Sequence, residues 1–238
     1  MKKIRLQLIL AAVLIAVVII VIIAWRPKLV AINNSAEVLN IEGANAQSYA
    51  AEQAPVWRDG DMIFGSSEAV VKIFVYEDYA SIYSAALAKT LAKARTEFKK
   101  PVAVIVRPYV LENSALSRSA ALIVTCAAEQ KKWAEMRTLV FAQAENQQAI
   151  GDNLDEYVEQ IGLNKNKFGL CLTNEEKSGK IEQAMAEAVG YGVLGAPTIF
   201  IGSEMILGAR PYADFVDSNG DTIEGLRATI MKKLAEVD

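Results

Sequence analysis

Hydrophobic residues are distributed unevenly along this chain, and the first apolar segment is the longest. Residues 6–25 are apolar except for Gln7, and basic side chains precede them at Lys2, Lys3 and Arg5. At about 1.5 Å rise per residue, a helix of this length spans roughly 30 Å, the thickness of a bilayer's hydrocarbon core. An aromatic residue, tryptophan, ends the segment, as is typical of membrane interfaces. We therefore predict a transmembrane anchor within residues 1–27.

A cleaved signal peptide is the alternative for this segment. Its apolar core should have about 7–15 residues and be followed by a small-x-small cleavage site. The core here is longer, and the sequence around Trp25 makes a poor cleavage site. More basic residues precede the segment than directly follow it, which favours a cytoplasmic N-terminus. We expect a single-pass protein of a bacterial-type inner membrane, with the rest of the chain in the periplasm or an equivalent extracytoplasmic space.

Beyond the anchor, the pattern changes to that of a globular domain. Residues 28–60 are rich in Ala, Asn, Gln and Ser with weak periodicity, so we predict a tether or a partly ordered lead-in. Residues 70–76 and 101–107 are β-branched and aromatic runs typical of buried strands, and residues 82–98 have helical spacing. A strand, a helix and a strand in this order predict a parallel pair with a right-handed crossover.

A long helical region follows, from about residue 114 to residue 189. We expect Gly151, Gly162 and Gly179 to divide it into several helices. The predicted domain therefore covers residues 61–238, with a helical insert at about 113–190.

The C-terminal part predicts a hairpin and a last helix. Residues 198–201 and 205–207 are apolar, and a turn at Gly202 and Ser203 separates them. Residues 222–235 have apolar side chains at three- and four-residue spacing, which predicts an amphipathic helix. The fold class is therefore α/β, a thioredoxin-like fold with a helical insertion, preceded by one N-terminal transmembrane helix.

Composition narrows the chemistry that this domain can carry. The net charge of −3 offers no basic field for nucleic acid. The chain has no histidine, which excludes Ser-His-Asp and Cys-His catalysis and histidine-ligated metal sites. Two widely separated cysteines do not suggest a zinc site. We expect no metal, no cofactor and no nucleic-acid partner.

Several segments, in their order and spacing, resemble the DsbA-like thiol-disulfide oxidoreductases. The resemblance covers about residues 62–236 and implies a thioredoxin fold with a helical insert. It includes an entry into the first core strand, an acidic-aromatic approach to the active site, a stretch of the insert, a loop that carries a cis-proline, and the segment that follows this loop. These segments are residues 65–71, 77–79, 126–130, 192–198 and 208–212.

The sequence departs from the family at the position of its catalytic Cys-x-x-Cys, which reads Ser81-Ile82-Tyr83-Ser84. Disulfide exchange requires a thiolate that attacks sulfur, and a serine hydroxyl cannot form a disulfide. A serine alkoxide is not populated near neutral pH without a base. We therefore expect no catalytic residue and no redox activity at this site. Ser81 either caps the helix or hydrogen-bonds a thiol or an anion at the helix N-terminus.

The resemblance also implies a binding loop. Pro197 is expected to be cis and to expose the backbone of Ala196 to an extended ligand beside Ser81 and Tyr83. The alternative is a rigid turn that enters a strand.

The two cysteines are either buried free thiols or one structural disulfide. Family members carry cysteines near both places, and an oxidising compartment favours a Cys126–Cys171 bond within the insert. Such a bond would contribute roughly 4 kcal/mol by chain entropy.

The acidic pair Glu77 and Asp78 precedes the serine motif. It is either a solvated strand end or a pair of buried acids left without a thiol to tune.

These inferences converge on a hypothesis of binding rather than catalysis. The leading function is a membrane-anchored, redox-inactive scaffold, chaperone-like or assembly protein. Its partners would be the bilayer, through residues 6–25, and an envelope protein or peptide. One alternative is a thiol-disulfide oxidoreductase whose active-site cysteines were replaced by engineering. Another is a glutathione-dependent transferase or isomerase of the kappa type, in which Ser81 would stabilise the glutathione thiolate.

Overall fold

The structure, a computed structural model, describes residues 48–99, 101–148 and 151–237. They lie in one of two compact units of the chain, Ile41–Asp238. The predicted transmembrane segment and most of the predicted tether lie outside the described residues. No helix in the described part of the chain is both long enough and apolar enough to cross a membrane.

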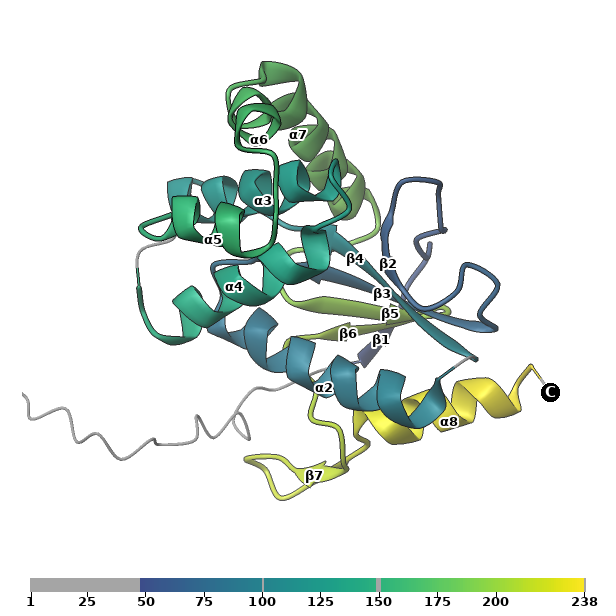
Figure 1. Ribbon diagram of the computed structural model, residues 1–238. Helices are drawn as coiled ribbons and strands as arrows, with labels where there is room; N and C mark the ends of the chain where they lie inside the picture. Colours follow the sequence, from purple (N-terminus) through teal and green to yellow (C-terminus); the bar gives the residue numbers. More distant parts are fainter. Residues whose placement is uncertain (1–47, 100, 149–150, 238) are drawn as a thin grey trace, which may run out of the picture. The chain divides into compact units, whose positions relative to one another are not determined.

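A six-stranded mixed sheet forms the centre of the described residues (Figure 1). Its strands lie in the order β1-β6-β5-β3-β4-β2, and only β3 and β4 pair in parallel. A separate two-stranded sheet pairs β7 with β8. The bounds are β1 (Ser48–Ala50), β2 (Met62–Phe64), β3 (Val71–Glu77), β4 (Val102–Pro108), β5 (Thr198–Ile201), β6 (Glu204–Leu207), β7 (Phe215–Val216) and β8 (Thr222–Ile223).

Seven helices accompany these strands in the described part of the chain. Helix α2 (Ile82–Phe98) connects β3 to β4 and produces the predicted parallel pair. The insert follows as α3 (Ala115–Ala128), α4 (Trp133–Glu145), α5 (Leu154–Gln160), α6 (Lys165–Leu172) and α7 (Glu175–Gly190), and α8 (Leu226–Ala235) ends the fold. The predicted thioredoxin-like order with a helical insert is therefore confirmed.

Three local expectations were wrong or incomplete. Gly179 does not break the insert, because it lies inside α7, whose interior tolerates one glycine at a cost of about 1 kcal/mol. The last helix begins at Leu226 and not at residue 222, since Gly225 packs against the backbone of Ala213, where a Cβ atom would come within 2.3 Å. Strand β1 lies within the predicted lead-in and pairs with β6 at the edge of the sheet.

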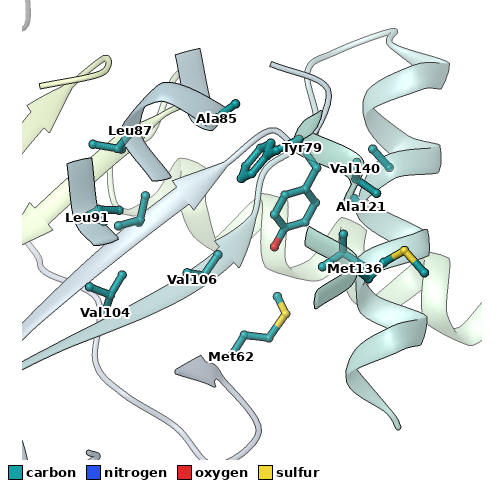
Figure 2. Packing of buried hydrophobic residues seen from close by; sticks show 14 of the residues in the cluster. Met62, Tyr79, Ala85, Leu87, Leu91, Val104, Val106, Ala121, Met136 and Val140 are labelled. Atoms are coloured by element: carbon teal, nitrogen blue, oxygen red, sulfur yellow. The ribbon is translucent and has the colours of Figure 1, made fainter. Parts of the chain in front are cut away.

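The two faces of the sheet carry different cores. Valine and isoleucine side chains of β3, β4 and β5 form the larger core together with α2, α3, α4 and α8. Figure 2 shows part of this core, with Leu91 of α2 near Val104 of β4. Aromatic side chains of the opposite face pack against the end of α7 and against Trp57. Strand β3 is thus buried on both faces, as its apolar run predicted. Its pairing with β4 and β5 fixes the position of its C-terminal end.

Candidate binding site

Three chain segments meet at one edge of the sheet because of strand direction and register. Glu77 at the end of β3 lies opposite Pro108 at the end of the parallel strand β4. Tyr76 lies opposite Thr198, the first residue of the antiparallel strand β5. The segment before α2 (residues 78–81), the segment before α3 (residues 109–114) and the loop before β5 (residues 191–197) therefore all emerge where these central strands end. We call this part of the sheet the β3 edge.

The serine motif begins helix α2 at the β3 edge. Ser81 is the N-cap, and its Oγ accepts a hydrogen bond from the amide of Ser84 at 3.4 Å. The Ser84 side chain is fully buried, and its Oγ accepts a hydrogen bond from the amide of Asp78 at 3.2 Å. Ile82 is half-buried and Tyr83 is exposed. Both serine hydroxyls thus hold the chain in place at the start of α2.

Asp78 is the carboxyl group that lies next to this motif. It is buried, and it accepts hydrogen bonds from the Ala80 amide at 2.9 Å and from the Ser117 hydroxyl. Burial raises the pKa of Asp78, and these two hydrogen bonds lower it by less. The carboxyl therefore fixes the loop between β3 and α2 and the start of α3.

Of the two interpretations of the acidic pair, the solvated strand end is wrong for both Glu77 and Asp78, because both side chains are buried. Glu77 is fully buried and paired with Arg137 of α4 through two hydrogen bonds, one of them from Nε to Oε2 at 2.7 Å. The guanidinium of Arg137 also lies 4.8 Å from the ring centroid of Phe141. A buried carboxylate needs such a partner, because desolvation of an unpaired charge is costly. Arg137 is a site residue that the sequence analysis did not identify.

The peptide bond between Ala196 and Pro197 is cis. The Pro197 carbonyl accepts a hydrogen bond from the Gly208 amide at 2.8 Å, and the Thr198 hydroxyl donates one to the Gly195 carbonyl at 2.7 Å. Among the described residues, neither the amide nor the carbonyl of Ala196 has a hydrogen-bond partner. The loop is therefore fixed on both sides of Ala196, and the Ala196 backbone can pair with another chain.

Large apolar side chains of the three segments are exposed. Leu194 is 82% exposed, and Tyr83, Leu111 and Leu116 are exposed as well. Exposed apolar side chains that come from three segments of one edge are typical of an interaction surface. The sequence analysis identified Tyr83 but missed the three leucines, whose exposure depends on tertiary structure.

The two cysteines lie away from the serine motif. The structure joins Cys126 of α3 to Cys171 of α6 in a disulfide bond, and both side chains are buried. No group of three or more acidic, histidine or cysteine side chains in the described residues could hold a metal ion.

Comparisons with known proteins agree with the fold described above. Residues 58–218 match a protein-family model described as thioredoxin. No curated protein sequence matches significantly. A thioredoxin-like oxidoreductase from Silicibacter pomeroyi superposes with a TM-score of 0.59 at 16% identity, and covers 75% of this chain and 92% of its own. A periplasmic thioredoxin-like protein from Salmonella enterica serovar Typhimurium superposes with a TM-score of 0.57 at 22% identity, over 74% of this chain and 91% of its own. The thiol-disulfide exchange protein alpha-DsbA2 from Wolbachia pipientis superposes with a TM-score of 0.56 at 18% identity, over 75% of this chain and 87% of its own.

Proposed function

Because the chain belongs to the thioredoxin family and is similar in fold to DsbA-like proteins, we propose that it keeps a chain-binding edge and has lost disulfide exchange. It would bind an extended segment of an envelope protein at the β3 edge and act as a scaffold, a chaperone-like factor or an assembly protein. Residues 6–25 would anchor it in the inner membrane, with the domain on the periplasmic side.

One observation carries this proposal. The two hydroxyls that replace the catalytic thiols are both hydrogen-bond acceptors at the start of α2, while the backbone of Ala196 has no partner among the described residues. An extended peptide could pair with that backbone, and its apolar side chains could contact Tyr83 and Leu194. Such binding requires no sulfur at positions 81 and 84.

The disulfide of the insert does not replace the missing thiols. Labile, catalytic disulfides are strained or exposed, whereas Cys126 and Cys171 are 0% and 5% exposed. They connect two helices of the insert, α3 and α6. We assign this bond a structural role.

Insulin reduction and dithiol oxidation by the full chain test the redox part of the proposal. The parent protein should show no turnover above the blank. The matched control is the double variant Ser81→Cys/Ser84→Cys, which should gain turnover because the N-terminal end of a helix lowers the pKa of a thiol.

Parent turnover well above the blank would contradict the loss of redox activity. A folded double variant that stays inert with both substrates would contradict the claim that the β3 edge still admits an extended chain.

A further inference from the structure

A cavity of about 520 Å³ lies between α2 and α4, on helix faces that the proposed function does not use. This volume is in the range of small-molecule sites. Figure 1 shows the two helices side by side, and they run antiparallel. Lys89, in the middle of α2, pairs with Glu145 at the end of α4, whereas Arg95 and Arg137 both lie over the ring of Phe64.

Alanine residues keep this cavity open. Ala88 and Ala92 of α2 and Ala134 and Ala142 of α4 line it, so no large side chain fills the space between the helices. The lining follows α2 from Ala85 to Arg95, which corresponds to about 15 Å along the helix. The cavity is therefore long, it opens to solvent beside Ala92 and Ala142, and most of its wall is apolar.

One end of the cavity carries a positive charge without a counter-charge. Arg95 stacks over Phe64 at 3.9 Å, and among the described residues its guanidinium has no acidic partner. The other charged groups of the lining are all paired: Lys89 with Glu145, Arg137 with Glu77 and Glu135 with Lys132. Burial, and then the charge of Arg137, lower the pKa of Arg95, as expected for an uncompensated guanidinium.

We propose that this cavity binds a single-chain aliphatic carboxylate, with its head group on Arg95 and its chain along the alanine faces. A guanidinium accommodates a carboxylate through two parallel hydrogen bonds, and one unpaired arginine matches one negative charge. A peptide fits less well, because the helical walls have no free backbone groups with which its amides could pair. An aliphatic chain brings no such groups.

Photolabelling of the full chain with dodecanoate that carries a terminal diazirine tests this site. Labelling should be saturable and should map to peptides of α2 and α4. Arg95→Gln should lower it by about 10-fold or more, as expected for the loss of a charge-assisted hydrogen bond. Lys93→Gln is the matched control, because it removes an exposed charge of α2 that does not line the cavity, and it should leave labelling unchanged.

Three further arms separate a specific site from general affinity for amphiphiles. Arg95→Lys should retain part of the labelling, because the ammonium keeps the charge but not the two parallel hydrogen bonds, and Ala88→Leu should abolish it by filling the cavity. The dodecylamine analogue with the same diazirine should label these helices weakly.

Equal labelling of the parent and Arg95→Gln, equal labelling by the amine, or labelling confined to residues 6–25 would overturn the proposal. If Arg95→Gln does not fold, as judged by its thermal transition, Arg95→Lys and Ala88→Leu decide the question. Retained labelling in Arg95→Lys together with loss in Ala88→Leu then supports the site, and any other combination overturns it.

Discussion

Glu77→Gln should lower the free energy of unfolding by about 3 kcal/mol, because it leaves the buried guanidinium of Arg137 without a counter-charge. The side chains of Glu77 and Arg137 are 0% and 8% exposed, so water cannot replace the lost partner. Removing one member of a buried ion pair costs about 3–5 kcal/mol. The glutamine carbonyl can still accept one hydrogen bond from Arg137, which places the expected loss at the lower end of this range.

Urea denaturation of the Ile41–Asp238 unit, followed by far-ultraviolet circular dichroism, measures this loss. A loss of 3 kcal/mol corresponds to a decrease in Tm of about 6–12 °C for a domain of this size. The double variant Glu77→Gln/Arg137→Met should recover most of the stability, since an apolar side chain suits the space beside Phe64 and Phe141. A loss below about 1 kcal/mol in the single variant would refute the reasoning, and so would a double variant that is less stable than the single one.

Three smaller perturbations give further predictions for the same unit. Ser81→Ala should lower the free energy of unfolding by about 1 kcal/mol by removing the N-cap of α2, as measured by urea denaturation. Replacing Cys126 and Cys171 by alanine should cost about 4 kcal/mol by chain entropy, and the parent should lose a similar amount on reduction. Burial raises the pKa of Asp78 above its ordinary value of 3.8, so the folded state keeps the Asp78 proton to a higher pH than the unfolded state does. The Asp78 carboxyl therefore lowers the free energy of unfolding as the pH rises above about 3.8. Asp78→Asn should therefore be at least as stable as the parent at pH 7, and its free energy of unfolding should depend less on pH in the acid range. A variant that is less stable than the parent at pH 7 would contradict the raised pKa of Asp78.

Local periodicity was sufficient to predict most of the architecture. The β-branched runs of β3 and β4 and the helical spacing of α2 predicted the parallel unit, because buried strands and packed helices need these patterns. The same reasoning placed the β5–β6 hairpin around Gly202, whose φ of +62° favours glycine.

Contacts between distant parts of the chain could not be predicted from such patterns. The sequence could not decide whether Glu77 is solvated or buried, because its partner, Arg137, is 60 residues away on helix α4. The exposure of Leu111 and Leu194 depends on how three segments meet at the β3 edge. The cavity beside Arg95 likewise depends on how α2 and α4 pack, which no single helix pattern specifies.

The site residues likewise divide into those that the sequence motifs identified and those that only the structure revealed. Ser81, Tyr83, Ala196 and Pro197 could be named because the order of motifs resembles a known family. The partners of Ser84 and Asp78, which fix the geometry around them, became apparent only in the structure.

Site-specific photocrosslinking in the native membrane tests the central claim, binding of an envelope partner at the β3 edge, most directly. A photoreactive amino acid at position 194 would probe this edge, and the same residue at position 170 is the matched control, because Leu194 and Leu170 are 82% and 73% exposed and Leu170 lies on α6 of the insert. We expect a reproducible protein adduct from position 194 alone, which Tyr83→Ala should weaken. Equal adducts from both positions, or none from position 194, would contradict the account.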